Sequence, residues 1–210
     1  NSGRSIAANS GWNTNPDASA IAAVAGRVGA FPFVAASLDS AVLATLAPGS
    51  YTAQVTGGSG TALIEVYDAD DSSTPGSRAV NISTRAQVGS DERQLIAGFV
   101  INGAASRKVL IRAVGPSLAQ FGLDGFLSEP QIELYDQRGR LLQRAGAWWA
   151  QPNANEVSAS SVIAGAFPLD DFSRDAALVT TLLPGSFTVQ VSSLDRVSAG
   201  LALVEVYDLP

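Results

Sequence analysis

The chain of 210 residues contains no cysteine, no histidine and no methionine. The lack of cysteine excludes disulfides, thiolate metal sites and thiol nucleophiles. The lack of histidine removes the commonest general base and the commonest transition-metal ligand. We therefore expect a protein that is not an enzyme and holds no cofactor. A chain with so few oxidisable side chains also suits an extracellular or cell-surface location.

Positive charge is scarce as well, with 13 Lys and Arg against 19 Asp and Glu and a net charge of -6. Nucleic acids and anionic membranes attract basic patches, so we expect neither as a partner. No apolar run reaches the roughly 18 residues that cross a bilayer, so no membrane insertion is expected. With 46% apolar residues, the chain can nevertheless bury a substantial core.

An internal repeat dominates the rest of the sequence. Three motifs recur, the first two at an offset of 136 residues and the third after a four-residue insertion in the second copy. They are Gly-Ala-Phe-Pro at 29–32 and 165–168, Pro-Gly-Ser-Tyr/Phe-Thr at 48–52 and 184–188, and Glu-Val-Tyr-Asp at 65–68 and 205–208. The segment 73–136 has no earlier counterpart. The chain therefore reads as a back half (1–72) followed by a complete unit (73–210), whose front half is 73–136 and whose back half is 137–210.

Short apolar or alternating segments between turn residues predict strands throughout. In the front half these are 79–85, 94–102, 108–114 and 131–135. In the back halves they are 5–8, 42–46, 51–55 and 62–67, matched by 141–144, 178–182, 187–191 and 201–207. So many closely spaced strands favour an all-β fold of repeated antiparallel, jelly-roll-like β-sandwiches.

Turn and helix signals complete this prediction. Gly49 and Gly185 each follow a proline between two strands that we expect to form a hairpin, and each should take the positive φ of the turn. One short helix is expected in each back half. The first should begin at Pro16 with Asn15 as its cap, and the second should lie at 152–163.

Three motifs taken together resemble the bacterial pre-peptidase C-terminal type of β-sandwich domain. They are Leu-Tyr-Asp-Gln-Arg-Gly at 134–139, Leu-Pro-Gly-Ser-Phe-Thr-Val-Gln-Val at 183–191 and Ala-Leu-Val-Glu-Val-Tyr-Asp at 202–208. The unit also resembles repeated domains of large secreted bacterial proteins through Val-Leu-Ile-Arg-Ala-Val-Gly-Pro-Ser-Leu at 109–118. The resemblance implies export and a β-sandwich, and it implies no activity and no catalytic residue.

Several side chains are candidates for a site. Asp68, Asp70 and Asp71 offer oxygen ligands that Ca²⁺ favours, but the segment lacks the glycine and the downstream glutamate of an EF-hand, so we expect a solvated linker after a strand rather than a Ca²⁺ site. The repeated aspartates Asp39 and Asp175 are expected to cap turns rather than bind metal.

Aromatic and acidic residues add two further candidates. The repeated Trp12 and Trp148 are expected to fill the core rather than form a glycan platform. The repeated Glu65 and Glu205 should face away from their apolar neighbours, and they lie in different copies, which argues against a catalytic carboxylate pair.

The functional hypothesis depends on the presence of two back halves and only one front half in the sequence. A back half alone has open strand edges, and such edges aggregate unless other strands cover them. We expect a non-catalytic structural subunit of an extracellular bacterial filament, array or matrix. Copies would assemble head-to-tail by strand complementation between repeat halves. The alternative is a glycan- or Ca²⁺-binding accessory module of a larger secreted enzyme or adhesin.

Overall fold

The computed structural model describes residues 4–58, 60–70, 78–90 and 93–210. The chain divides into two compact units, Asn1–Ala79 and Val80–Pro210. This division lies a few residues after the one expected at 72.

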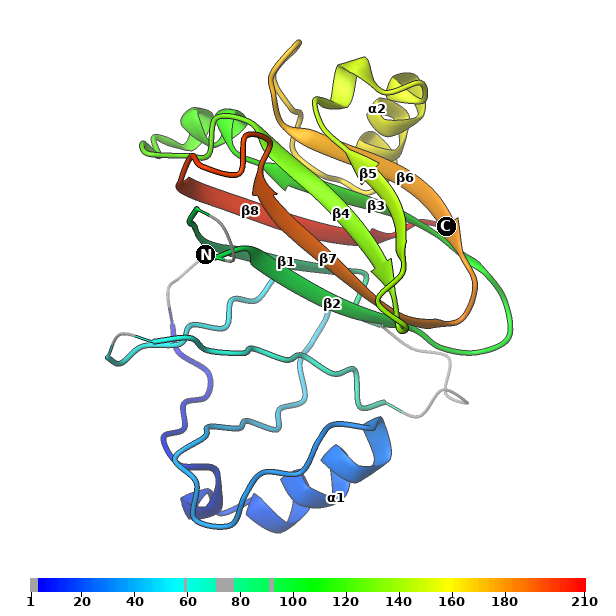
Figure 1. Cartoon of the computed structure of the whole chain (residues 1–210). Helices are drawn as coiled ribbons and strands as arrows, with labels where there is room; N and C mark the ends of the chain where they lie inside the picture. Colours follow the sequence, from blue (N-terminus) through cyan, green and yellow to red (C-terminus); the bar gives the residue numbers. More distant parts are fainter. Residues whose placement is uncertain (1–3, 59, 71–77, 91–92) are drawn as a thin grey trace. The chain divides into compact units, whose positions relative to one another are not determined.

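The second unit contains eight strands, shown with their labels in Figure 1. They are β1 (Asn81–Val88), β2 (Leu95–Ile101), β3 (Arg107–Val114), β4 (Pro130–Asp136), β5 (Leu141–Ala145), β6 (Ala176–Leu182), β7 (Gly185–Ser193) and β8 (Gly200–Asp208). One four-stranded sheet has the order β1-β8-β3-β6 and the other has the order β2-β7-β4-β5. All pairs are antiparallel, and this pairing of two interleaved four-stranded sheets is that of a jelly roll. The prediction of an all-β sandwich is confirmed.

Each sheet alternates strands of the two repeat halves. Every ladder joins one strand of the front half, β1 to β4, to one strand of the back half, β5 to β8. Figure 1 shows this as green front-half strands beside the orange to red back-half strands β6, β7 and β8, with the back-half strand β5 in yellow-green next to β4. Within 80–210, neither half therefore contains a pair of strands that could form a sheet by itself.

The expected hairpin of 178–182 and 187–191 is wrong. β6 and β7 lie in different sheets, so the residues between them cross from one layer to the other. The predicted positive φ is wrong at Gly49 and is confirmed at Gly185, which has φ 157° at the first residue of β7. The crossing chain has no need of a tight two-residue turn, because its flanking strands are not paired with each other.

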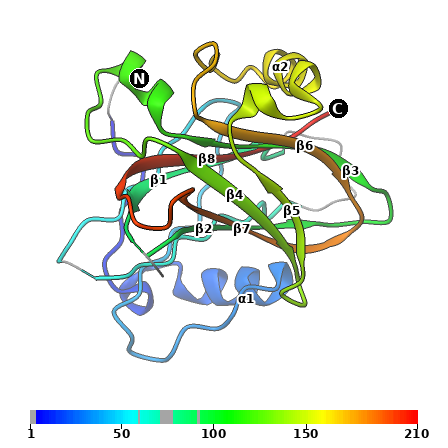
Figure 2. The same cartoon turned by 45° about the horizontal axis from the view of Figure 1, so that its top comes forward.

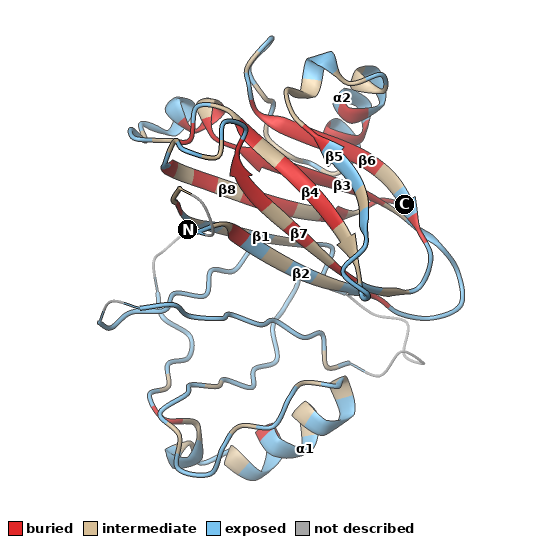
Figure 3. Cartoon of the chain, in the orientation of Figure 1, coloured by how far each residue is buried: buried red, intermediate tan, exposed pale blue. Residues whose placement is uncertain are grey.

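The β1-β8-β3-β6 sheet is covered on both of its faces. Val109, Ile111 and Val204 face the other sheet in the main core. On the opposite face, Leu110 and Tyr207 pack with Val157 of α2 (Ala154–Ile163), which lies against β6 (Figure 2). Because β3 is buried on both sides, its last six residues form an uninterrupted buried run (Figure 3).

The first unit contains the helix α1 (Ala18–Val28) and a 3-10 turn at Trp12–Thr14. Its described residues form no strand, so the strands predicted at 5–8, 42–46, 51–55 and 62–67 are not present there. The physical reason follows from the pairing in the second unit. The strands of a back half pair only with front-half strands, and isolated strands do not form in water.

Both helices form, although they begin later than predicted. The Asn15 side chain accepts a hydrogen bond from the Asp17 backbone N–H at 3.0 Å, and this local turn occupies the residues expected to start the helix. Asp17 and Asn153 therefore take the cap positions, two residues after the expected one at Asn15 in the first copy. No helix in the described part of the chain is long and apolar enough to span a membrane.

Candidate functional site

Two of the three acidic residues proposed as Ca²⁺ ligands, Asp68 and Asp70, lie in the described part of the chain. Asp68 uses one carboxylate oxygen to accept the Asp70 N–H and the other to accept the Ala79 N–H, both at 3.1 Å. Asp71 lies outside the described residues. Across those that are described, no cluster of three acidic side chains is arranged to hold a metal ion.

The repeated tryptophans hold matching positions in the two units. The Trp148 ring nitrogen donates to the Asp170 carbonyl at 3.3 Å, and the Trp12 ring nitrogen donates to the equivalent Val34 carbonyl at 3.3 Å. Both rings are half-buried, and Trp148 packs against the core under α2. Each ring is thus engaged at its edge and on its face by its own unit.

Asp175 is the centre of a buried hydrogen-bond network. It has no exposed surface, and its Oδ1 accepts the Gly115 N–H at 2.7 Å. Its Oδ2 accepts the hydroxyl of Ser173 at 2.6 Å and that of Ser117. The network ties the start of β6 to the Gly-Pro-Ser turn that follows β3, which means that a back-half carboxylate fixes a front-half turn.

The equivalent network in the first unit is incomplete. Asp39 is exposed, and Ser37, the counterpart of Ser173, has a buried hydroxyl without a hydrogen-bond partner in the described residues. The backbone around these residues is nevertheless the same, since the Trp12 N–H donates to the Asp39 carbonyl as the Trp148 N–H donates to that of Asp175. Asp39 lacks the hydrogen-bond donors that a Gly-x-Ser turn supplies to Asp175 in the second unit.

A fully buried arginine is the most unusual feature of the second unit. Arg112 on β3 has no exposed surface, and its Nε donates to Glu205 Oε2 on β8 at 2.8 Å. Nη2 lies 2.7 Å from the same oxygen, at ion-pair distance but without hydrogen-bond alignment. Nη1 donates to the Phe167 carbonyl at 2.6 Å. This pair joins neighbouring strands from the two halves, since Arg112 lies opposite Glu205 in the ladder.

Aromatic rings surround this ion pair. The guanidinium lies 4.4 Å from the centre of the Phe167 ring and 6.0 Å from that of Tyr207. The Tyr207 hydroxyl donates to Glu205 Oε1 at 2.8 Å. Burial, together with the negative charge of Glu205, raises the pKa of Tyr207 far above its usual value. The group is therefore a neutral tyrosine that completes the carboxylate's hydrogen bonds, and it is not poised to exchange protons.

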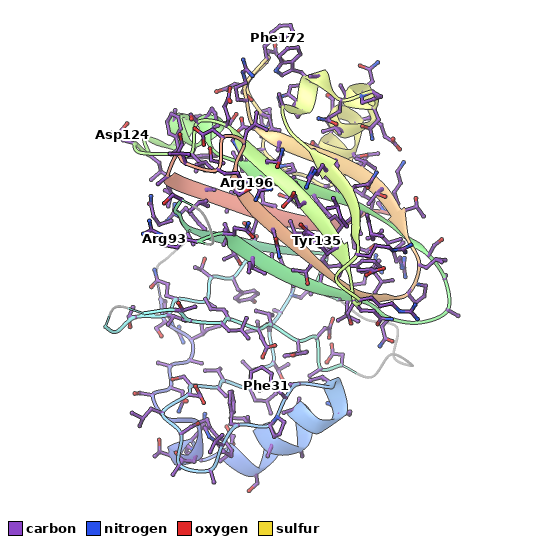
Figure 4. The ribbon with its side chains drawn as sticks, viewed as in Figure 1. Phe31, Arg93, Asp124, Tyr135, Phe172 and Arg196 are labelled. Atoms are coloured by element: carbon purple, nitrogen blue, oxygen red, sulfur yellow. The ribbon has the colours of Figure 1, made fainter. Side chains whose placement is uncertain are left out.

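The first unit has the back-half members of this cluster without the arginine. Glu65, Tyr67 and Phe31 are the counterparts of Glu205, Tyr207 and Phe167. The Tyr67 hydroxyl already donates to Glu65 Oε1 at 3.1 Å, as its counterpart does. Phe31, labelled in Figure 4, is exposed.

A second ionic cluster lies on the outer face of the β2-β7-β4-β5 sheet (Figure 4). Glu133 Oε1 lies 2.6 Å from Arg144 Nε and 2.9 Å from Arg196 Nη2, and Oε2 accepts the Tyr135 hydroxyl at 3.1 Å. Burial alone would raise the pKa of Glu133, but the hydrogen bonds from the two arginines outweigh it and lower the pKa. This cluster also joins the halves, since Glu133 belongs to the front half and both arginines to the back half.

The apolar side chains show the same difference between the two back halves. Large side chains that are buried in 137–210 have exposed counterparts in 4–70. The pairs are Leu178 and Val42, Leu182 and Leu46, Phe187 and Tyr51, Val191 and Val55, Val204 and Ile64, and Tyr207 and Tyr67. The first unit therefore carries a set of side chains suited to a sandwich interior that no front half covers.

The polar clusters of the second unit join strands and turns of the two repeat halves. Ser117, the most enclosed hydroxyl of the network around Asp175, donates to the carboxylate of that residue. Sequence reasoning placed Glu65 and Glu205 on the polar side of their strands, but it did not find Arg112 as the partner. The available signal was a lone arginine inside the apolar run 109–114, because a charge at such a position requires a partner.

No family model matches the chain, and no curated protein is similar to it in sequence. Among solved structures, the chain is similar to a pre-peptidase C-terminal domain of a collagenase from Bacillus anthracis. The two share 12% sequence identity and superpose with a TM-score of 0.36, over 60% of this chain and 89% of that domain.

Proposed function

We propose that the chain is a non-catalytic structural protein of an extracellular bacterial filament, array or matrix, assembled by strand complementation between repeat halves. One observation carries the proposal: each ladder of the second unit joins a front-half strand to a back-half strand. Completing a unit is therefore an association of two partners, whether they lie on one chain or on two. Addition of strands to an open edge is an established way in which proteins assemble.

The first unit supplies an unsatisfied partner for such an association. Its strand segments have no ladder among the described residues, and the apolar side chains that match the core of the second unit are exposed. Burying six such side chains contributes on the order of 10 kcal/mol before the ordering of the chain is subtracted. A front half would recover this free energy by covering them.

The number of halves limits how copies can assemble. Residues 1–210 contain one front half and two back halves, so exchange of strands between copies leaves as many open back halves as before. Net assembly is driven only when a further front half is supplied. The partner that we propose is therefore an unpaired front half of the same repeat, carried by a chain that has a front half in addition to that of residues 1–210.

Two extended chains test this proposal. One has a second copy of residues 71–136 after Pro210, which places an open back half at one end and an open front half at the other. The matched control has the same segment before Asn1, which allows both sandwiches to close within one chain. We expect concentration-dependent fibres or large oligomers from the first chain, and a monomer with two complete units from the second.

Light scattering and electron microscopy measure assembly, and circular dichroism measures the added strand content. A closed ring or a monomer from the first chain, even with added strands, would contradict an open assembly. A first unit that gains no strands in either chain would contradict complementation itself.

A further inference from the structure

We infer that residues 4–70 select their front half by two polar contacts, in which Glu65 receives an arginine and Asp39 receives a Gly-x-Ser turn. The expected partner therefore carries the pattern Arg-x-x-Gly-x-Ser, as at Arg112, Gly115 and Ser117 of this chain. This inference rests on the proposed function and adds the chemistry by which the partner is recognised.

The second unit shows why the arginine must come from the partner strand. Arg112 and Glu205 are both buried, and a buried charge is tolerated only with an opposite charge and hydrogen bonds. The carboxylate, its tyrosine and the Phe167 carbonyl all belong to the back half, whereas the guanidinium belongs to the front half. The back half thus carries the negative charge of the ion pair, and the front half carries the positive charge.

The first unit presents the same acceptor group without a cation. Tyr67 and Glu65 are hydrogen-bonded as their counterparts are, and no arginine among the described residues contacts Glu65. A front half that closed over Glu65 without supplying a cation would bury an unpaired carboxylate, which is strongly unfavourable. A front half with an apolar residue at the Arg112 position is therefore disfavoured, even though its strands could pair.

The second contact lies three residues further along the partner strand. In the complete unit the Asp175 carboxylate accepts the N–H of Gly115 and the N–H and hydroxyl of Ser117. In the first unit, Asp39 is exposed, and the Ser37 hydroxyl is buried without a partner in the described residues. Asp39 gains hydrogen bonds when a Gly-x-Ser turn arrives, because the backbone that holds it already has the required form. In the complete unit the counterpart of Ser37, Ser173, donates to the aspartate and not to the turn.

The two contacts together fix the register of the incoming strand. A slip of one residue would turn the arginine toward the apolar interior and remove the turn from the aspartate. The apolar side chains alone cannot impose this, since many strands present alternating valine, leucine and isoleucine. We therefore assign affinity to the apolar set and selection to Glu65 and Asp39.

The probe is a peptide of residues 78–136, which needs no fold of its own, titrated into the full chain by calorimetry. We expect one peptide to bind per chain. Glu65→Gln in the chain or Arg112→Gln in the peptide should each weaken binding at least tenfold, and the two together should cost little more than either alone. Asp39→Asn should weaken binding by a smaller factor.

Asp17→Asn is the matched control in the chain. It removes a carboxylate from the same unit at a position where the second copy already has Asn153, so binding should not change. Peptide binding that is indifferent to Glu65, Asp39 and Arg112 would overturn the inference and leave complementation intact. Failure of the unaltered peptide to bind would overturn the proposed function as well.

Discussion

The two back halves share the hydrogen bonds of their helical segments and differ in every strand. The backbone N–H of Ile21 bonds to Asp17 as that of Val157 bonds to Asn153, and the N–H of Ala30 bonds to Ala25 as that of Ala166 bonds to Ser161. Each helix also ends next to a glycine in the left-handed conformation, Gly29 with φ 77° and Gly165 with φ 67°. The strands, in contrast, are present only in 137–210.

This difference separates local from long-range determinants of structure. A helix satisfies its hydrogen bonds within its own segment, so the same residues form it in both contexts. A strand satisfies them only with another strand, and here that strand always belongs to the front half. Substitutions at equivalent positions of the two back halves can therefore measure what the front half contributes.

The largest contrast is expected for a charge placed on the core side of a back half. Val191 is fully buried, whereas its counterpart Val55 is 64% exposed. Val191→Asp should lower the free energy of unfolding of the second unit by at least about 4 kcal/mol, because it buries an unpaired carboxylate. Val55→Asp should change it by no more than about 0.5 kcal/mol. Urea unfolding followed by circular dichroism compares the two, and equal losses would remove the distinction between the back halves.

The next contrast concerns the two glutamates. Glu205→Gln should destabilise the second unit by about 3 kcal/mol, since it leaves Arg112 buried without its counter-charge. Glu65→Gln should leave thermal unfolding unchanged, because Glu65 is exposed and has no cation beside it in the described residues. A comparable drop in melting temperature for both variants would show that Glu65 is already paired.

The two aspartates should differ by a smaller amount. Asp175→Asn replaces one accepting oxygen with an amide donor that faces other donors, and we expect a loss of about 2 kcal/mol. Asp39→Asn in the chain without added peptide should leave the free energy of unfolding unchanged. Amide hydrogen exchange at Gly115 and Ser117 provides a local check, since both N–H groups should exchange faster only in the Asp175 variant. Unchanged protection there would contradict the role assigned to Asp175.

The smallest effect is expected at low pH and concerns the second unit alone. The pKa of Glu133 is lower in the folded unit than in an unfolded chain. Its contribution to stability is thus complete above about pH 4.3, the value of a free glutamate, and is lost as the pH falls through the lowered folded pKa. Lowering the pH should reduce the free energy of unfolding less in the Glu133→Gln variant than in the unaltered protein. The difference should be about 1 kcal/mol or less, because Arg144 and Arg196 are partly exposed. Denaturation at pH 7 and pH 3 measures this, and an identical loss in both proteins would contradict it.

Much of the second unit could be predicted from the sequence. All eight strands and the helix α2 lie where alternation and turn residues indicated, with ends that differ by a few residues. The assignment of strands to sheets could not be predicted from spacing, so β6 and β7 were expected to be neighbours. The strands of the first unit were predicted wrongly because their apolar pattern matches that of the second copy. Among the described residues, however, no front-half strand pairs with them.

The candidate site was only partly accessible to sequence reasoning. The repeat identified Asp39, Asp175, Trp12 and Trp148 as equivalent pairs, but it did not show that Asp175 binds a front-half turn. Arg112 was hidden because the front half occurs once, so no second copy marked it. Its partnership with Glu205 depends on the register of β3 and β8, which only the fold provides.

The alternation of halves in both sheets has a consequence for synthesis on the ribosome. No strand of 80–136 can form its observed ladders before residues of 137–210 emerge, and the ladder between β1 and β8 must wait for the last strand of the chain. Residues 4–70 have by then already left the ribosome. The newly made front half is therefore available to the first back half before its own has been made. We expect the two back halves to compete for it during folding, with an outcome that depends on their order of emergence and their affinity.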